Sequence, residues 1–182
     1  MKLVETPIKD LVVIEPRVFG DDRGYFFESY NKANFASAGL HYDFVQDNES
    51  RSKYGVLRGL HFQNAPMAQT KLVRVTEGKV FDVGVDLRDG SPTYGQHYGI
   101  ELSAENKRQY LVPRGFAHGF VVLSESAVFC YKCDNVYSAE HEGGIKFDDP
   151  AFGIDWHIPS DDIILSERDK NQPTFKEAEF QF

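Results

Sequence analysis

Segment 55–63 reads Gly-Val-Leu-Arg-Gly-Leu-His-Phe-Gln, an apolar, strand-forming run that carries three polar side chains, Arg58, His61 and Gln63. Histidine exchanges protons and binds metal ions near neutral pH, so its place in such a run raises the question of chemistry. Polar side chains among core residues suggest a cavity inside a β-barrel, with His61 pointing into it. The alternative is a buried structural histidine with a backbone hydrogen-bond partner.

A metal site is the first chemistry to test, because two short motifs resemble those of the cupin β-barrels. Gly55 is followed six residues later by His61, as in the first cupin motif, and the run Pro-x-Gly-x-x-His118 is similar to the second. Metal-binding cupins have a second histidine where this chain has Gln63, and then a glutamate, whereas residues 64–71 contain no carboxylate. A divalent ion needs three or four converging ligands, so we expect a cupin without a metal.

The pair Cys130-x-x-Cys133 is a second candidate for metal or redox chemistry. Residues three apart on a strand point to opposite faces, so the two thiols should not converge, and we expect structural cysteines. Tyr131 lies between them and shares a face with Phe129 and Cys133. A tyrosine on such a strand usually packs in the core with its hydroxyl hydrogen-bonded.

Three further charged residues lie on neighbouring predicted strands. Lys71 opens one of them, where a lysine is usually solvated. Asp82 and Asp86 share a strand face with Gly84, while the alternating apolar residues of this strand share the other face. We therefore expect both carboxylates to face solvent, with a supporting role for one of them beside Lys71 as the alternative.

Ten short strand-like runs, separated by turns, organise the chain around these residues. They are Leu11–Phe19, Gly24–Tyr30, Phe44–Asn48, Val56–Gln63, Thr70–Thr76, Lys79–Leu87, Gln96–Leu102, Arg108–Val112, Ala117–Leu123 and Ala127–Lys132. This pattern predicts an all-β antiparallel sandwich or barrel. Short helices are expected only at 31–38 and 173–179, and the loop-rich tail from Asp148 should pack onto the body through Trp156, Ile163, Ile164 and Leu165.

Length and charge narrow the function class. The 182 residues predict a single domain, 1–182, and 41% apolar residues suffice for a core. No apolar run approaches a membrane span, and residues 1–7 lack the apolar core of a signal peptide, so we expect a cytoplasmic protein without membrane contact. A formal net charge of −8 argues against nucleic-acid binding, although a few arginines could still hold a phosphorylated ligand.

Beyond the cupin motifs, the chain resembles the dTDP-4-dehydrorhamnose 3,5-epimerase family from Val4 to about Phe175. The resemblance is carried by Phe19-Gly-Asp-Asp-Arg-Gly24, Phe27-Glu-Ser29, Phe44-Val-Gln-Asp-Asn48, segment 55–63, Lys71-Leu-Val-Arg74, Phe81-Asp-Val83, Leu102-Ser-Ala-Glu-Asn106, Pro113-Arg-Gly-Phe-Ala-His-Gly-Phe120, Tyr131-Lys132 and Ser166-Glu-Arg-Asp-Lys170. It implies a cupin-type antiparallel jelly-roll β-barrel with short peripheral helices. It also implies an isomerase that uses neither metal nor organic cofactor.

The resemblance implies a substrate in which a 4-keto-6-deoxyhexose is joined through a diphosphate to thymidine. His61 is then the base, Asp169 its partner, and Tyr131 the acid on the other face of the sugar. Lys71 is implied to stabilise the enolate oxygen, and His118 is expected near the sugar.

Further residues of the chain match the family's ligand contacts. Arg23, Arg58 and Arg168 are implied to bind the diphosphate and nucleotide, and Glu28, Gln46, Asn48 and Glu142 to complete the ligand shell. The family forms homodimers with exchanged N-terminal segments, so Arg23 and Glu28 are expected to serve the neighbouring site.

Strict alternation places Arg58 opposite His61, so either a bulge at Gly59 or a position at the barrel mouth would be needed to bring Arg58 to the ligand. Three other functions stay open at this point: epimerisation at C3 alone, a nonenzymatic sugar-binding jelly roll, and a metal-dependent cupin enzyme, which Gln63 disfavours.

Overall fold

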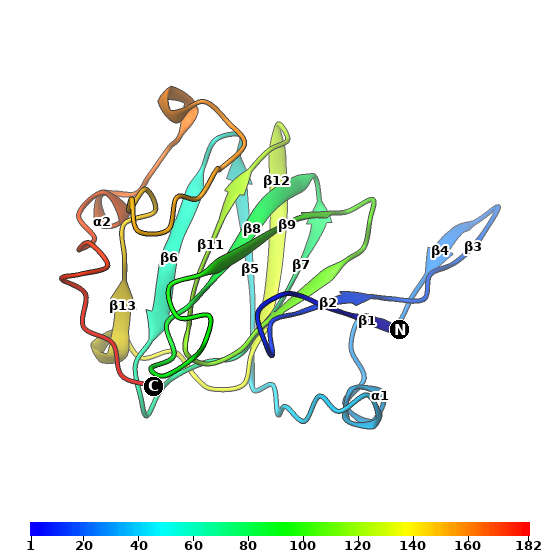
Figure 1. Ribbon diagram of the computed structural model, residues 1–182. Helices are drawn as coiled ribbons and strands as arrows, with labels where there is room; N and C mark the ends of the chain where they lie inside the picture. The colour runs from blue at the N-terminus through cyan, green and yellow to red at the C-terminus, as the bar shows by residue number, and fades with distance from the viewer.

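The computed structural model describes residues 1–182 and contains two facing antiparallel sheets (Figure 1). The six-stranded sheet has the order β1 (Lys2–Glu5), β2 (Val12–Glu15), β10 (Gln109–Val112), β7 (Lys71–Glu77), β12 (Ser126–Cys133) and β5 (Gln46–Lys53). The five-stranded sheet has the order β13 (Glu142–Gly144), β6 (Leu57–Gln63), β11 (Phe116–Val122), β8 (Lys79–Asp86) and β9 (His97–Ser103). A separate hairpin of β3 (Phe19–Asp21) and β4 (Gly24–Phe26) projects away from them. The predicted all-β jelly roll is confirmed.

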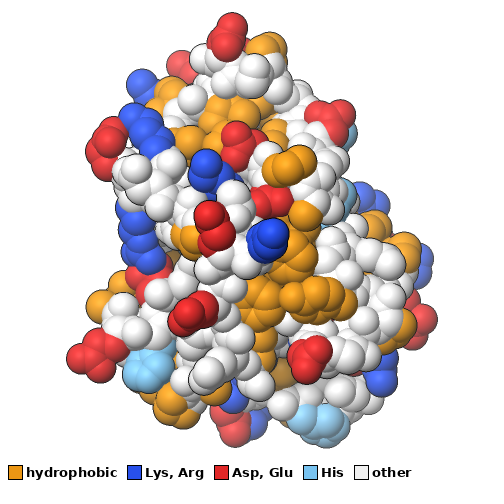
Figure 2. Space-filling model, turned by 60° about the vertical axis from the view of Figure 1, so that its left-hand side comes forward, with side chains coloured by type: hydrophobic (Ala, Val, Ile, Leu, Met, Phe, Trp, Pro, Cys, Tyr) orange, Lys and Arg blue, Asp and Glu red, His pale blue; other side chains and the backbone are white.

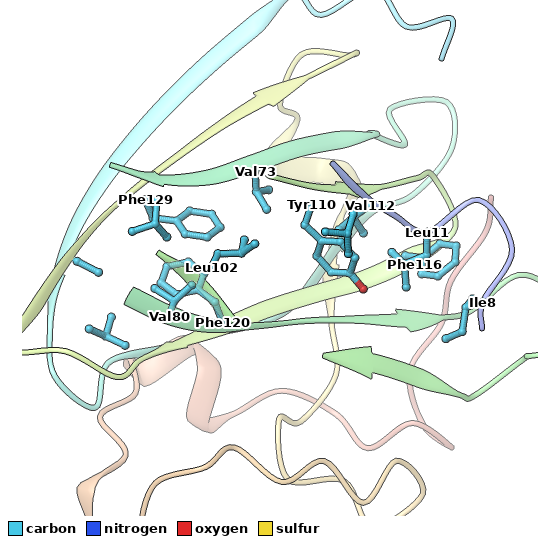
Figure 3. Packing of buried hydrophobic residues seen from close by; sticks show 14 residues of the cluster. Ile8, Leu11, Val73, Val80, Leu102, Tyr110, Val112, Phe116, Phe120 and Phe129 are labelled. Carbon is cyan, nitrogen blue, oxygen red and sulfur yellow. The ribbon is translucent and has the colours of Figure 1, made fainter. Parts of the chain in front are cut away.

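The main core lies between the two sheets, as Figure 3 shows. Val73 and Phe129 come from the six-stranded sheet, and Val80 and Phe120 come from the five-stranded sheet. The rings of Phe120 and Phe129 stack with their centroids 4.0 Å apart. Each buried aromatic or aliphatic side chain of this kind contributes about 1.5–3 kcal/mol. These contacts hold the two sheets at a fixed separation.

The chain after β13 covers the outer face of the five-stranded sheet, on the left of Figure 1. Phe152 and Trp156 pack there against Val83 and Val85 of β8. The predicted docking of the tail is confirmed for Trp156, whereas Ile164 is exposed. Seen from this side in Figure 2, hydrophobic side chains are interspersed with charges of both signs.

Because the chain after β13 packs on the outer face of the five-stranded sheet, the side chains of β8 point in directions opposite to those expected. The outward face of the strand carries Val83 and Val85, which the tail buries, so the alternate residues Asp82 and Asp86 point between the sheets. Both carboxylates are 0% exposed, and the expectation that they face solvent was wrong. The prediction that Asp82 and Asp86 share one strand face was correct. The prediction that this face contacts water was wrong, because both faces of β8 are buried.

The helices are short and peripheral. They are α1 (Lys32–Ser37), which the Asn31 side chain caps as predicted, α2 (Glu167–Lys170), and the 3₁₀ turns η1 (Ala139–His141) and η2 (Ser160–Asp162). None of the helices has the length and apolar character that a bilayer span needs.

The helix predicted at 173–179 is absent, and this segment forms only a turn. The backbone N–H of Phe175 donates instead to a carboxylate oxygen of Asp149, at 2.7 Å, and its ring packs against Phe152. These contacts hold segment 173–179 against the rest of the protein. Strands β1 and β13 were not predicted, the latter because Glu-Gly-Gly carries no strand signal.

A β-bulge on β6 settles the position of Arg58. His61 pairs with His118 and Arg58 pairs with Phe120, so Gly59 and Leu60 of β6 stand opposite the single residue Gly119. Gly59 has a φ of 151°, and a Cβ there would lie 2.6 Å from the Cα of Gly119, so only glycine fits. The extra residue shifts the alternation by one and brings Arg58 to the same face as His61. Of the two alternatives, the bulge is the one observed.

Candidate active site

A cavity of about 540 Å³ opens between the two sheets, within the usual size range of small-molecule sites. The five-stranded sheet contributes β6 and β11 to its wall, and the six-stranded sheet contributes β5, β7 and β12. The tail around α2 closes one side. The polar side chains that line it are Asn48, Glu49, Ser50, Arg58, His61, Lys71, His118, Tyr131, Ser166, Arg168 and Asp169. The cavity therefore gathers residues from five strands and the C-terminal segment.

His61 forms a pair with Asp169 at the start of α2. The Nε2 atom of His61 lies 2.5 Å from Oδ1 of Asp169, and Ser166 donates its hydroxyl to the other carboxylate oxygen at 2.8 Å. Ser166 also caps the helix by accepting from the backbone N–H of Asp169. Because a carboxylate can only accept, Nε2 carries the hydrogen, and the neutral ring keeps its lone pair on Nδ1.

Asp169 stays ionised although it is buried. Burial acts to raise its pKa, but the hydrogen bonds from His61 and Ser166 outweigh burial and leave the pKa below its usual value. An ionised Asp169 stabilises a positive charge on the His61 ring, which is what a base needs after it has taken a proton.

Lys71 is the first residue of β7 and lies opposite Cys133 of β12. Its side chain is half-buried in the cavity rather than solvated at a strand end. Burial lowers the pKa of its ammonium group, while the acidic groups of Cys133, Asp82 and Glu142 act against this effect. A cation in such a water-poor site stabilises a nearby oxyanion far better than it would in solvent.

Tyr131 lies on the wall opposite His61. It follows Phe129 by two residues on β12 and shares the inward face with it, as alternation predicted. Burial raises the pKa of its hydroxyl, and the charge of Arg58 partly opposes this. The phenol is therefore protonated at neutral pH and can deliver that proton. His61 and Tyr131 come from different sheets, so they face each other across the cavity.

A second histidine–aspartate pair lies beside the first. His118 and His61 are direct neighbours on β11 and β6, and Nε2 of His118 lies 2.8 Å from Oδ1 of Asp82. His118 is 7% exposed and Asp82 is fully buried.

The residues predicted to bind the nucleotide fall into two groups. Arg58, Asn48 and Arg168 line the cavity. Two others lie next to them: Glu142 accepts from Arg168 at 2.6 Å, and Gln46 donates to the amide oxygen of Asn48 at 3.1 Å.

Arg23 and Glu28 lie elsewhere in the chain. Arg23 is at the tip of the projecting hairpin, where it pairs with Asp21, and Glu28 accepts hydrogen bonds from Asn31 and Asn34 beside α1. Neither residue lines the cavity of its own chain.

Sequence reasoning missed Ser166, Glu49 and Ser50 of this cavity, and it offered a role for Asp82 only as the alternative to a solvent-facing position. Ser166 had a local signal, because serine three residues before an acid marks a helix N-terminus. Asp82 had none, since its burial depends on a tail more than 60 residues away. Nowhere does the structure bring together three or more His, Cys, Asp or Glu side chains in an arrangement that could hold a metal ion.

Comparison with known proteins places this cavity in a family. A family model described as dTDP-4-dehydrorhamnose 3,5-epimerase matches residues 5–177. The chain belongs to the dTDP-4-dehydrorhamnose 3,5-epimerase family. An epimerase of that name from Pseudomonas aeruginosa is 57% identical over 180 residues, which cover 98% of each chain.

Solved structures of other members of the epimerase family agree with the fold. A crystal structure of dTDP-4-dehydrorhamnose 3,5-epimerase from Elizabethkingia anophelis has a TM-score of 0.94 and 62% identity, and the match covers 97% of each chain. A 3,5-epimerase from Legionella pneumophila, solved in complex with dTDP-4-keto-L-rhamnose, has a TM-score of 0.95 and 45% identity, covering 100% of this chain and 98% of that one. The protein is thus an isomerase of the epimerase class with a jelly-roll fold.

Proposed function

We propose that the protein converts dTDP-4-dehydro-6-deoxy-D-glucose into dTDP-4-dehydro-L-rhamnose by inverting C5 and C3, with neither metal nor organic cofactor. The observation that carries this proposal is the placement of His61 and Tyr131 on opposite walls of one cavity, with Lys71 beside Tyr131 on the same sheet. Inversion of a carbon centre by proton transfer needs a base on one face and an acid on the other.

The chemistry follows from the C4 ketone. Nδ1 of His61 takes the proton from C5, and the electrons of the C–H bond move to the C4 oxygen to form an enolate. The ammonium group of Lys71 stabilises this negative oxygen. The hydroxyl of Tyr131 then protonates C5 from the opposite face and the carbonyl re-forms. The imidazolium of His61 gives its proton to solvent, and the phenolate of Tyr131 takes a proton back from solvent. The same steps at C3 complete the reaction, because C3 and C5 flank the same carbonyl.

The nucleotide part of the substrate would lie along the arginines of the cavity. Arg58 and Arg168 offer planar guanidinium groups that suit diphosphate oxygens. Asn48 supplies amide groups next to them, with Gln46 and Glu142 fixing the neighbouring side chains. His118 is placed for the sugar, beside His61.

Proton NMR in deuterated water tests this function directly. When the purified protein acts on the 4-keto-6-deoxyglucose nucleotide, we expect deuterium to enter at both C3 and C5, together with the L-sugar product. Exchange at C3 alone would replace this proposal with a 3-epimerase. Tight binding of the nucleotide sugar without any exchange would replace it with a sugar-binding jelly roll.

We further propose that the protein acts as a homodimer in which each N-terminal segment completes the neighbouring site. The hairpin of β3 and β4 exposes three aromatic residues, Phe19 at 51%, Tyr25 at 63% and Phe26 at 70%, which is unusual for a free surface. Arg23, at the tip of this hairpin, has the side chain of a diphosphate ligand but lies away from its own cavity.

Mixed dimers of two inactive variants test the exchange. Arg23→Ala and His61→Ala chains, unfolded together and refolded, should regain close to half of the wild-type activity per mixed dimer. One site then combines an intact His61 with an intact Arg23 from the other chain. If Arg23 acts within its own chain, every site in the mixed dimer carries one defect and activity does not return.

We also infer a cytoplasmic location without membrane or nucleic-acid partners. The two cysteines are free thiols, as suits a reducing compartment, and the net charge of −8 opposes binding to nucleic acid or anionic lipid.

A further inference from the structure

Asp82 is a buried carboxylate that contacts the cavity-lining His118 and has no part in the mechanism above. It is 0% exposed, and its Oδ1 atom accepts from Nε2 of His118 at 2.8 Å. Its Oδ2 atom is buried with no hydrogen-bond partner in the protein. A buried polar atom without a partner destabilises the folded protein, more so if it is charged, so its presence calls for a reason.

The other buried carboxylate of β8 shows what a purely structural role looks like. Asp86 is equally buried and lies on the same face of the same strand. It accepts from the guanidinium of Arg88 and from the hydroxyls of Ser91 and Thr93, so both of its oxygens are satisfied. Asp82 has a single partner, and that partner lines the cavity.

We propose that Asp82 is a positioning residue for the sugar end of the cavity, where it fixes the ring of His118 and supplies the counter-charge for Lys71. An ionised carboxylate accepts only, so it selects the His118 ring with hydrogen on Nε2 and leaves Nδ1 as an acceptor for a sugar hydroxyl. This role rests on the proposed epimerase activity of the same site.

The electrostatics of Lys71 support the second half of the proposal. Burial lowers the pKa of Lys71, and the acidic groups of Cys133, Asp82 and Glu142 oppose this effect. The ionisable groups that share the cavity region with Lys71 come from both sheets and from the tail. They are Glu49 on β5, Cys133 and Tyr131 on β12, His61 and Arg58 on β6, His118 on β11, Asp82 on β8, Glu142 on β13, and Arg168 and Asp169 on α2. Among the carboxylates, Glu142 already accepts from Arg168 and Tyr137, whereas one oxygen of Asp82 is unpaired.

The test compares Asp82→Asn with the matched control Asp86→Asn. We expect Asp82→Asn to lower kcat by roughly 10–100-fold while KM stays within about threefold of wild type, as for other residues that support a reacting group. The pKa of Lys71, followed by NMR of its labelled side chain, should fall in the same variant. Asp86→Asn should melt at a lower temperature but keep its kcat. Equal kcat in the two variants, or an unchanged Lys71 titration, would overturn the proposal.

A measurement on the wild-type protein covers the case in which Asp82→Asn does not fold. The ¹⁵N chemical shifts of the His118 ring, assigned from their loss in His118→Gln, report which nitrogen carries hydrogen in the neutral form. Hydrogen on Nε2 supports the proposal, and hydrogen on Nδ1 refutes it. Since this spectrum needs no substrate, the positioning role and the epimerase activity of the wild type can fail independently of each other.

Discussion

His61→Ala is expected to lower kcat for epimerisation by at least about 10³-fold, near the upper range for removal of a general base. Asp169, whose pKa is lowered, holds Nε2 of His61 on the wall opposite Tyr131, so the lone pair on Nδ1 is free to accept a proton. No exchange of the C3 or C5 protons should remain, because abstraction precedes every later step. The affinity for dTDP, measured by calorimetry, should stay within about threefold of wild type, since the diphosphate contacts lie on other residues.

Two further variants show whether His61 acts as the base. Asp169→Asn keeps the imidazole but removes its charged partner, so a smaller loss, of about 10²-fold, is expected. His97→Ala, on the edge strand β9 outside the cavity, should leave kcat unchanged. Proton exchange that persists in His61→Ala would assign the base to another residue.

Tyr131→Phe is expected to separate proton exchange from inversion. The variant keeps His61 and Lys71, so it can still form the enolate and exchange the substrate protons with solvent. It lacks the acid on the far wall, so formation of the L-sugar should fall by roughly 10²–10³-fold, more than exchange falls. Deuterium incorporation into recovered substrate, compared with product formation in one NMR experiment, measures both rates.

Tyr110→Phe is the matched control for this substitution. Tyr110 is fully buried in the main core, where its hydroxyl donates to the carbonyl of Tyr98 at 3.0 Å. Loss of that hydrogen bond should cost about 1 kcal/mol of unfolding free energy without changing the ratio of inversion to exchange. If Tyr131→Phe slows exchange and inversion equally, Tyr131 is not the final acid.

The strands that carry the site could be predicted from local patterns. β6, β7 and β12 have apolar alternation that places His61, Lys71 and Tyr131 within a few residues of their observed strand positions. The roles of these residues came from the family resemblance, since alternation alone left His61 as a possible structural histidine and Lys71 as a solvated one.

The features that the sequence did not reveal depend on contacts between distant segments. Asp82 was assigned to solvent because nothing local shows that the tail covers Val83 and Val85 of β8. The bulge at Gly59 stayed undecided because glycine permits both regular and bulged strands, and its close approach to Gly119 of β11 selects the bulge. The helix expected at 173–179 does not form, because Phe175 makes contacts with Asp149 and Phe152 instead.

A crystal structure of the protein with its 4-keto sugar nucleotide, or with a stable analogue, tests the central claim most directly. We expect Nδ1 of His61 within about 3.5 Å of C3 or C5 on one face of the hexose, and the Tyr131 hydroxyl on the other face. The ammonium of Lys71 should lie within hydrogen-bond distance of the C4 oxygen, about 3 Å. A hexose with His61 and Tyr131 on the same face, or with Lys71 directed away from C4, would contradict the account.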